Sequence, residues 1–319
     1  MKVTSPIRWR RYRSFKFTGT QVACNLCGAD EVSVVARRDR WLQSLTNVMC
    51  QRCGLVYLQP MPDNNELDEF YRHHFWQRSQ GTTDPTPKQI WRSFRSAEGR
   101  LAILAPVLKP GARILDVGAG GGEFVTVAQR HGFMAEGIEP SANYVSYAQR
   151  VYKVTIHGGT LTEVDIGDRR FDVITCSHAL EHMRDPLGAL KKLHELLEPA
   201  GHAFIWVPDL IEPGRWPYRN FHPGHLHGFT HETLVMMAAK AGFEVPDDGP
   251  KSTCLLLRRG SGPDPNWFRF PGHAERLKAR LKRQTVWRYL CSAQSWRRIP
   301  SRIAYWFMAH VMARHMTNI

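Results

Sequence analysis

The chain has 319 residues and a formal net charge of +14 at pH 7. Its length suffices for one large domain or two modest ones, and no run approaches the ~20 apolar residues that a membrane-spanning helix needs. Residues 1–17 are rich in arginine and lack the apolar core of a secretory signal, so a cytoplasmic location is expected. Seven cysteines in that compartment are better explained as thiols or metal ligands than as disulfides.

The basic character lies at the two ends of the chain. Residues 1–20 carry six basic and no acidic residues, and residues 251–319 carry 14 basic and two acidic residues, which leaves residues 21–250 at −4. A protein that reads nucleic acid usually surrounds its cleft with basic groups, so this distribution weakens the case for a nucleic-acid partner. Residues 1–20 are expected to be a basic arm, either solvated or in contact with an anionic surface.

Four cysteines follow in two C-x-x-C-G pairs, Cys24 with Cys27 and Cys50 with Cys53. Each pair fits a tight turn that offers two thiolates, and four thiolates complete a closed tetrahedral site for structural Zn²⁺. A redox role for C-x-x-C is the weaker alternative, because the motif occurs twice beside β-like segments. We therefore predict a zinc ribbon over residues 21–62.

The ribbon ends in G-L-V-Y-L-Q-P-M-P over residues 54–62, followed by an acidic, aromatic stretch. With the cysteine pairs, this resembles the N-terminal module of bacterial methyltransferases that include deoxysugar C-methyltransferases and enzymes of surface-polysaccharide and natural-product clusters. The resemblance implies that the module covers the active site, with Tyr71, His73 and His74 facing the acceptor pocket. The alternative is that these three are ordinary residues of a helix surface.

Residues 63–98 are expected to form a helical lid or linker. Turn-forming residues predict a loop or hinge over 78–90. A helix from about Gln89 to Leu108 should then lead into the first strand of the next domain, with Trp91 and Phe94 in the core.

The stretch I-L-D-V-G-A-G-G-G-E-F over residues 114–124 is the central motif of the chain. An apolar strand carries Asp116 and leads into a loop with glycine at every second position (Gly118, Gly120 and Gly122). Such glycines permit a tight turn into a helix and a close approach of backbone N–H groups to a ligand. Asp116 opposes a pyrophosphate and favours a cationic or amino-bearing ligand. Glu139, at the end of the next strand, is placed to hold ribose hydroxyls.

These features resemble the class I S-adenosylmethionine-dependent methyltransferases. The resemblance implies that the three glycines pack against the methionine part of the cofactor, S-adenosyl-L-methionine, and that Glu139 binds its ribose. A glycine-rich turn in some other α/β protein is the alternative, which the later strands make less favourable.

Strands and helices alternate from here in a pattern typical of a parallel sheet wound on both faces. Strands are expected at 114–117, 134–138, 154–157, 171–176, 202–207, 244–245 and 254–258, and helices at 123–131, 142–151 and 186–197, with a last helix ending at Lys240. We predict an α/β fold: a doubly wound, Rossmann-like, seven-stranded methyltransferase sheet over residues 99–260, with a small N-terminal zinc ribbon and a helical basic C-terminal tail. Ligands of such sheets bind at the carboxyl ends of the strands.

The segment F-D-V-I-T-C-S-H-A-L-E-H-M-R-D-P over residues 171–186 resembles the region that spans and follows strand four in methyltransferases. The resemblance implies that Ser177 and His178 lie beside the methionine end of the cofactor. It also implies that Glu181 and His182 begin the loop that faces the acceptor.

Adenine recognition is expected to depart from the family. Thr160 and Leu161 occupy the place where many relatives carry an acidic residue for the adenine amino group. The contact is therefore expected to pass to the backbone or to Thr162.

Four histidines fall within residues 222–231, in a segment similar to the family's H-L-x-x-F-T element. Their spacing places no pair on one helical face and no carboxylate cluster lies nearby in the sequence, which argues against a metal. A general base for a hydroxyl or an acidic C–H is favoured, because imidazole titrates near working pH. His225 is the first candidate and His182 the second; the alternative for His225 is a role in orienting the loop. Methyl transfer can also proceed largely by positioning, without a base.

Residues 261–319 form a predicted basic, Trp-rich helical tail outside the resemblance. Trp287, Trp296 and Trp306 stand among Lys and Arg, and the run 303–313 is too short to span a bilayer but suits an interfacial helix. Peripheral contact with an anionic membrane, at its inner face, is one expectation. Helices that pack on the body or on a second subunit are the other.

Together the motifs predict a methyltransferase that acts on a sugar, nucleotide-linked or in a glycan, as in polysaccharide biosynthesis. O-methylation is preferred to C-methylation, because the long extra C-terminal domain of the sugar C-methyltransferases is not seen. An RNA methyltransferase is an alternative, although no N-P-P-Y-like loop follows strand four and no Pro-Cys nucleophile occurs. A membrane-docked adaptor without turnover is the non-enzymatic alternative.

Overall fold

The computed structural model describes residues 17–70, 84–212, 216, 218–246, 252–284, 289 and 291. Several expectations fall outside them, namely most of the basic arm, the candidates Tyr71, His73 and His74, and the tail tryptophans Trp287, Trp296 and Trp306. Within these ranges, no helix combines the length and the apolar character that crossing a membrane requires.

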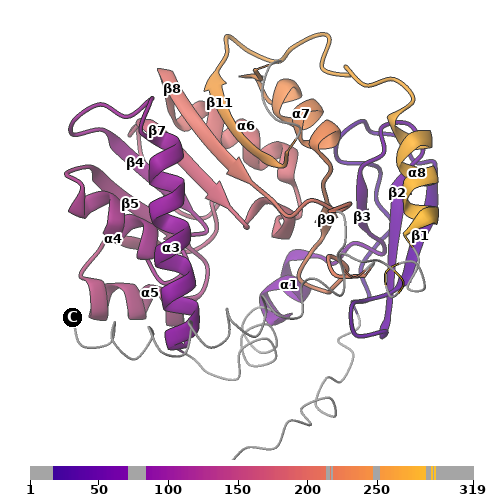
Figure 1. The fold of residues 1–319 in the computed structure, drawn as a ribbon, viewed down its shortest axis with the longest axis horizontal. Coiled ribbons are helices and arrows are strands. Elements are labelled where there is room, and N and C mark those ends of the chain that lie inside the picture. Colours follow the sequence, from indigo (N-terminus) through magenta and orange to yellow (C-terminus); the bar gives the residue numbers. More distant parts are fainter. Residues whose placement is uncertain are drawn as a thin grey trace, which may run out of the picture.

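A seven-stranded sheet forms the centre of the molecule, with the strand order β10-β11-β8-β7-β4-β5-β6 (Figure 1). Its strands are β4 (Arg113–Val117), β5 (Met134–Glu139), β6 (Ile156–Gly158), β7 (Phe171–Ser177), β8 (Leu197–Trp206), β10 (Phe243–Glu244) and β11 (Cys254–Arg259). The five from β6 to β8 in this order run parallel, and β11 is antiparallel to β8. The expected α/β fold with a mostly parallel seven-stranded sheet is confirmed. The order reverses between β4 and β7, which is where such sheets bind ligands.

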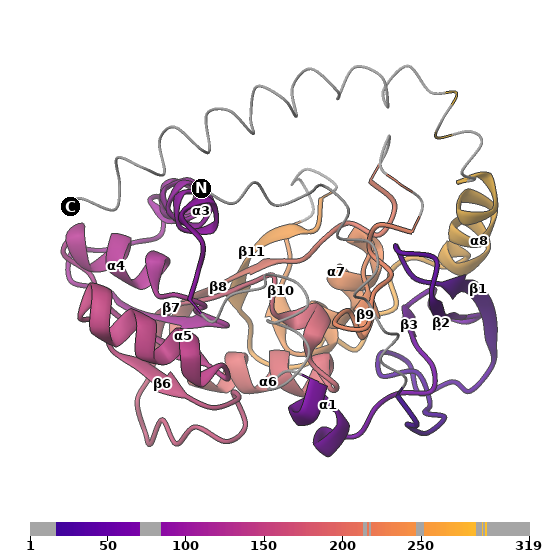
Figure 2. The ribbon, with the colours of Figure 1, turned by 90° about the horizontal axis from the view of Figure 1, so that it is seen from below.

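Helices cover both faces of this sheet (Figure 2). The helices are α3 (Pro87–Leu104), α4 (Glu123–Arg130), α5 (Ala142–Tyr147), α6 (Pro186–Leu196) and α7 (His231–Lys240). Successive strand residues point to opposite faces: Ile114 belongs to the core beneath α3 and α4, whereas Leu115 belongs to the core beneath α6 and α7. The sheet is thus buried on both sides, as the apolar character of its parallel strands requires.

Some element bounds differ from the sequence-based expectation. The helix expected over 142–151 is α-helical only to Tyr147 and continues as a π-helix over Ala148–Tyr152. β8 begins at Leu197 rather than at residue 202, because Leu197 already pairs with Phe171 of β7 and an irregularity in the register precedes the pairing of His202 with Val173. α3 begins at Pro87, since the Thr86 hydroxyl accepts a hydrogen bond from the Gln89 N–H and caps the helix there.

A second sheet carries the cysteine pairs and has the order β1-β2-β3-β9. Its strands are β1 (Val32–Arg38), β2 (Ser44–Cys50), β3 (Val56–Leu58) and β9 (His227–Gly228), and the short helix α1 (Asn64–Phe70) follows β3. The first three strands are local, but β9 comes from the segment after β8, with Tyr57 opposite His227. The two sheets therefore share one stretch of chain.

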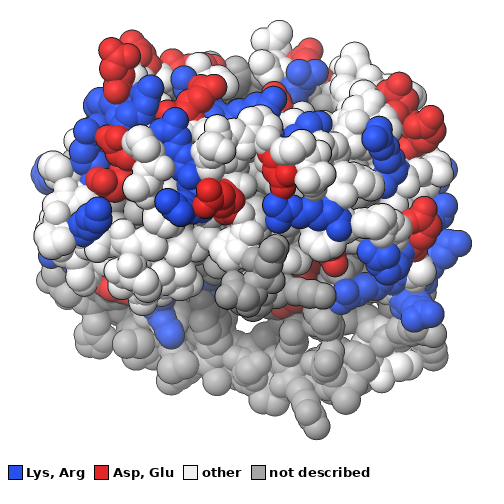
Figure 3. Space-filling view, turned by 90° about the horizontal axis from the view of Figure 1, so that it is seen from above, with Lys and Arg blue, Asp and Glu red and all other residues white. Residues whose placement is uncertain are grey.

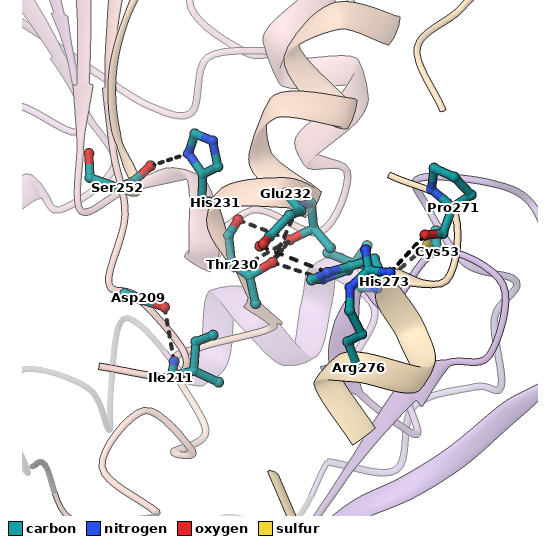
Figure 4. Close-up of polar contacts among 12 residues, drawn as sticks. Cys53, Asp209, Ile211, Thr230, His231, Glu232, Ser252, Pro271, His273 and Arg276 are labelled. Carbon is teal, nitrogen blue, oxygen red and sulfur yellow. Dashed lines mark hydrogen bonds and ion pairs between the residues drawn. The ribbon is translucent and has the colours of Figure 1, made fainter. Parts of the chain in front are cut away.

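Helix α8 (His273–Arg283) packs on the second sheet, where Ala274 and Leu277 join its core (Figure 1). Figure 4 shows how α8 also contacts the start of α7: His273 Nε2 lies 3.1 Å from the hydroxyl of Thr230, the residue that caps α7, and its Nδ1 lies 3.8 Å from Glu232. Part of the predicted tail is thus a helix that packs on the body.

Candidate functional site

The loop after β4 contains three glycines with positive φ, Gly118, Gly120 and Gly122, whose surroundings differ. A Cβ at Gly118 would lie 2.5 Å from the Ala179 Cβ, and one at Gly122 would lie 2.9 Å from the Ala148 Cβ. Close packing inside the protein therefore requires glycine at both positions. A Cβ at Gly120 would meet nothing within 4 Å. Gly120 is therefore the glycine of this loop that faces open space, where a ligand can approach the backbone.

The expected ligand-facing carboxylate of Asp116 is engaged within the protein. Asp116 is buried, and its Oδ1 accepts hydrogen bonds from Arg100 Nη1 at 2.8 Å and from the Thr175 hydroxyl. Burial raises the pKa of Asp116, while the charge of Arg100 opposes that change. Asp116 thus anchors the loop from behind, and its partner Arg100, on α3, has no signal in the sequence motif.

Glu139 ends β5 and lies next to Gly120. Its carboxylate accepts hydrogen bonds from the backbone N–H groups of Gly120 and Ser141, both at 2.9 Å. Burial raises its pKa to about 7, against the lowering effect of these two donors. The group therefore changes charge near neutral pH, and its position beside open space suits a partner that donates hydrogen bonds.

The segment after β6 holds the residues expected near adenine. Thr160 donates its backbone N–H to Glu163 Oε2 at 2.9 Å, and its hydroxyl lies 3.2 Å from that of Thr162, while Leu161 is buried. An acidic side chain is thus present three residues beyond Thr160. The sequence analysis considered only the position of Thr160 and so missed Glu163, whose carboxylate the turn places beside the Thr160 backbone.

Ser177 ends β7 and His178 follows it, at the switch point of the sheet. Ser177 is half-buried and pairs with Trp206 on β8. His178 has φ 54°, a left-handed conformation that is uncommon for a side-chain-bearing residue, and its ring lies 4.7 Å from that of Trp206. This turn presents a half-exposed imidazole and an indole side by side at the carboxyl end of the sheet, and the sequence motif did not single out Trp206.

Glu181 lies in the turn that follows, and its carboxylate is buried with a relative exposure of 1 %. Neither of its oxygens has a hydrogen-bond partner among the described residues. Three imidazole nitrogens face its Oε1: His182 Nε2 at 3.6 Å, His178 Nδ1 at 3.7 Å and His225 Nε2 at 3.9 Å. The sequence showed no carboxylate cluster near the histidine segment, and the fold brings one carboxylate, Glu181, to it from the turn after β7.

Backbone hydrogen bonds hold the histidine segment against this turn. The Leu226 N–H donates to the Glu181 carbonyl at 2.9 Å, and the Leu58 N–H of the cysteine-bearing sheet donates to the Leu226 carbonyl at 2.8 Å. His227 Nδ1 also contacts the Met183 carbonyl at 3.1 Å. The loop that carries His225 is thus fixed both to the turn of Glu181 and to the second sheet.

The two imidazoles expected to act as bases are each oriented by a backbone carbonyl. His182 Nδ1 lies 2.5 Å from the Gly224 carbonyl and His225 Nδ1 lies 2.9 Å from the Asn220 carbonyl. Since a carbonyl only accepts, each Nδ1 carries a proton in these contacts. Burial lowers the pKa of His225 to about 3, which makes it a weak proton acceptor at neutral pH.

The four paired cysteines meet at a single point in the second sheet. The Sγ atoms of Cys24 and Cys53 are 3.5 Å apart, those of Cys27 and Cys50 are 3.4 Å apart, and all four lie within 4.8 Å of one another. A tetrahedral zinc with Zn–S bonds of about 2.3 Å separates its sulfurs by roughly 3.8 Å. The four thiols therefore match the donor set and the approximate size of such a site.

Charges of both signs occur on the face of the molecule that Figure 3 shows. Over its described part, acidic groups are interspersed among basic ones. Half of the 20 basic residues in the two end segments, those at 1–16 and 292–319, lie outside the described ranges.

Comparisons with known proteins agree with this geometry. Residues 91–246 match the model of a family described as a methyltransferase domain. A ubiquinone biosynthesis O-methyltransferase of Coxiella burnetii is 30% identical over 140 residues, covering 36% of this chain and 60% of that protein. One of Vibrio cholerae is 31% identical over 101 residues, covering 30% and 41%. The chain thus spans about half the length of these curated relatives.

Solved structures of low sequence identity are also similar. The 1,6-didemethyltoxoflavin-N1-methyltransferase of Burkholderia thailandensis, with bound S-adenosylhomocysteine, has a TM-score of 0.49 and 23% identity, covering 65% of this chain and 96% of that one. An amino pentose methyltransferase of Micromonospora echinaspora has a TM-score of 0.40 and 18% identity, covering 52% and 91%. Residues 91–246, just under half of the chain, thus resemble a methyltransferase domain.

Proposed function

We propose that this protein transfers a methyl group from S-adenosylmethionine to a hydroxyl oxygen of a sugar, either nucleotide-linked or part of a glycan. The observation that carries the donor half is the open space at Gly120, bordered by the Glu139 carboxylate at the carboxyl ends of β4 and β5. The matched domain supports the same ligand.

The residues present fit this donor in a specific way. Glu139 would accept hydrogen bonds from the ribose hydroxyls, Gly120 would let the loop backbone come close, and His178 would border the methionine end. Glu163 or Thr162, beside Thr160, would face the adenine. The donor supplies an electrophilic methyl group on a positively charged sulfur, which the buried carboxylates around this loop favour electrostatically.

The acceptor half is supported by the polar groups beyond β7. The imidazoles of His178 and His182, with the Trp206 ring, offer hydrogen-bonding and stacking contacts to a hydroxyl-bearing ring. Hydroxyl oxygen is preferred over carbon because the curated relatives matched by the chain are O-methyltransferases. Positioning of the acceptor against the methyl group would supply much of the rate.

The four cysteines would hold a structural Zn²⁺ in the second sheet. Two tight turns, in which the Gly28 and Gly54 N–H groups donate to the carbonyls of Cys24 and Cys50, present the sulfurs to one point. All four ligands are thiolates in a closed shell, so the ion would stabilise the fold and take no direct part in methyl transfer.

Calorimetric binding of S-adenosylhomocysteine to wild type and to Glu139→Gln tests the donor half. We expect micromolar binding to wild type and a loss of at least tenfold in the variant, with unchanged thermal unfolding of the ligand-free protein as the folding control. Folded wild type that does not bind would overturn the proposal. Labelled methyl groups should then be offered with nucleotide sugars, glycans, RNA and phenolic hydroxyls; incorporation into RNA alone would contradict the sugar acceptor.

A further inference from the structure

Three buried carboxylates surround the glycine loop, and two of them have partners within the protein. Asp116 is paired with Arg100, and Glu139 accepts two backbone N–H groups. The third is Glu123, the first residue of α4, which is 5 % exposed. Among the described residues, no other residue donates a hydrogen bond to its carboxylate. A buried carboxylate in this condition is costly, and native proteins keep such groups where a ligand or a reaction uses them.

The place of Glu123 at the start of a helix does not account for its burial. The helix dipole favours an acidic side chain in the first turn, but an exposed carboxylate would gain the same benefit and keep its water. Burial instead raises the pKa of Glu123 to about 7; the charges of Asp116 and Glu139 act in the same direction, and that of Arg100 opposes them. The carboxylate is therefore about half protonated at pH 7 in the ligand-free protein.

The Glu123 carboxylate lies against the loop that faces the proposed donor. A Cβ at Gly121 would lie 2.7 Å from its Oε1 and 3.0 Å from its Oε2, so the side chain folds back onto the backbone of that glycine. The neighbouring residue is Gly120, which has open space around it and whose N–H donates to Glu139. Two carboxylates thus border one short stretch of loop, Glu139 from β5 and Glu123 from α4.

The role that the sequence gave to Asp116 is left open by the structure. Asp116 was expected to face a cationic or amino-bearing ligand, but Arg100 and the Thr175 hydroxyl engage it behind the loop. Glu123 carries the same charge and has neither of these partners. It is therefore the better candidate for the positive part of the ligand.

The donor, S-adenosylmethionine, carries two positive groups, the sulfonium and the α-ammonium. A buried carboxylate needs hydrogen-bond donors, and the ammonium offers three N–H groups whereas the sulfonium offers none. A carboxylate held on the sulfonium would also stabilise a charge that disappears during methyl transfer, which would oppose the reaction. The chemistry of both partners favours the ammonium.

We propose that Glu123 binds the α-ammonium group of the donor in place of Asp116, an inference that rests on the proposed function. Glu139 on the ribose and Glu123 on the ammonium would hold the donor at two points, with the sulfur atom between them. The two contacts would fix the direction of the methyl group toward the turn after β7, where positioning supplies much of the rate.

Two donor analogues test the assignment without an acceptor. S-adenosylhomocysteine carries the ammonium, whereas 5′-methylthioadenosine has the same ribose and a thioether but lacks the amino-acid part. By calorimetry, Glu123→Gln should weaken S-adenosylhomocysteine by roughly tenfold or more, because a charge-assisted hydrogen bond is lost, and should bind 5′-methylthioadenosine as wild type does. The matched control is Glu139→Gln, which should weaken both ligands because both carry the ribose.

Proton release provides a readout that a purely structural role would not change. At pH 7, in buffers of different ionisation enthalpy, wild type should release more protons with S-adenosylhomocysteine than with 5′-methylthioadenosine, because the ammonium drives Glu123 to its ionised form. This difference should vanish in Glu123→Gln. The other ionisable groups around Glu123 remain in that variant, so any contribution of theirs would persist; they are Asp116, Glu139, Arg100, Tyr144, Tyr147 and Tyr152.

Several results would overturn the assignment. Equal losses of both ligands in folded Glu123→Gln would leave only a structural role, and an unchanged affinity for S-adenosylhomocysteine would place the ammonium elsewhere. Equal proton release with the two ligands in wild type would also overturn it, and that comparison needs no variant. A folded wild type that binds neither ligand would instead refute the proposed function, and this inference with it.

Discussion

The molecule holds two side-chain clusters that the chain builds in opposite ways. The four cysteines come from two tight turns with 22 residues between Cys27 and Cys50, so their spacing alone predicts a site. The second cluster joins Glu181 and His182 to His225 from a loop about 40 residues later, and only tertiary hydrogen bonds bring them together. Local spacing reveals the first kind of site and conceals the second.

The clusters also differ in what they depend on. β9 is an edge strand of the cysteine-bearing sheet, and the residue before it, Leu226, bonds both to Leu58 of that sheet and to Glu181. Damage to the cysteine site should therefore reach the second cluster. Damage to the second cluster should leave the cysteine site intact.

The largest expected effect is that of Cys53→Ser. Metal binding to an all-cysteine site is coupled directly to folding, so we expect loss of Zn²⁺ and a fall of about 5 kcal/mol or more in the free energy of unfolding. The turn of Glu181 should loosen as well, because β9 loses its support and Leu226 bonds both to Leu58 and to Glu181. Zinc analysis and thermal unfolding measure the first two effects, and hydrogen exchange of the Leu226 amide measures the third. The control is Cys254→Ser on β11, and a variant that kept wild-type protection at Leu226 would refute the dependence.

The glycine loop provides variants that should spare both clusters. Gly118→Ala combines φ 77° with a Cβ 2.5 Å from that of Ala179, so we expect a loss of about 2–4 kcal/mol in unfolding free energy. Gly120→Ala, at φ 54° with open space around it, should cost about 1 kcal/mol yet weaken S-adenosylhomocysteine binding. Chemical denaturation and calorimetry distinguish them. Equal losses of stability would mean that open space at Gly120 is not what separates the two glycines.

Glu181→Leu tests the charges that meet in the second cluster. Burial raises the pKa of Glu181, but the charge of His182, with His178 and His225, lowers that pKa to about 2. We therefore expect the variant to lose about 1–3 kcal/mol of unfolding free energy at pH 7. The difference from wild type should shrink as pH falls from 4.5 toward 2, because the folded-state pKa is the lowered one. Denaturant titrations at pH 7 and pH 3 test this, and a variant more stable than wild type at pH 7 would contradict it.

The pH dependence of donor binding follows from Glu139, whose pKa burial raises to about 7. The ionised form is the one that accepts hydrogen bonds from ribose, so affinity for S-adenosylhomocysteine should rise as pH increases to 7 and level off above it. Below pH 7 the affinity should change by at most about tenfold per pH unit. The raised pKa also means that this group costs the ligand-free fold stability as pH rises from 4.5 to 7, because the folded state holds the extra proton. Glu139→Gln should flatten both profiles, and an unaltered slope would assign the titration to another group.

The smallest effect expected is that of Asn25→Ala, which tests the link between the regions. Asn25 lies inside the first cysteine pair, donates to Asp185 Oδ1 at 2.7 Å and accepts from the Leu187 N–H at 3.0 Å at the start of α6. We expect a loss of about 1 kcal/mol in the free energy of unfolding, with the zinc retained. The exposed variant Asn65→Ala on α1 is the control. Loss of zinc would place Asn25 in the support of the cysteine site itself.

The sequence predicted what depends on local pattern. Alternating apolar runs located most strands of the large sheet, and residue spacing located the four cysteines. It missed the early start of β8, where the chain pairs through an irregularity. It also missed Arg100 behind Asp116 and Glu181 beside the histidines, because both contacts join segments that no periodicity relates.

The pairing of β3 with β9 also has a consequence for folding while the chain is being synthesised. Tyr57 of β3 can pair only after His227 has been synthesised, 170 residues later. In the complete fold Val56, Tyr57 and Leu58 are almost wholly buried. During chain elongation this apolar strand has an open edge, the kind of surface that recruits other chains. A fragment that stops before residue 227 should therefore aggregate, even though it contains all four cysteines.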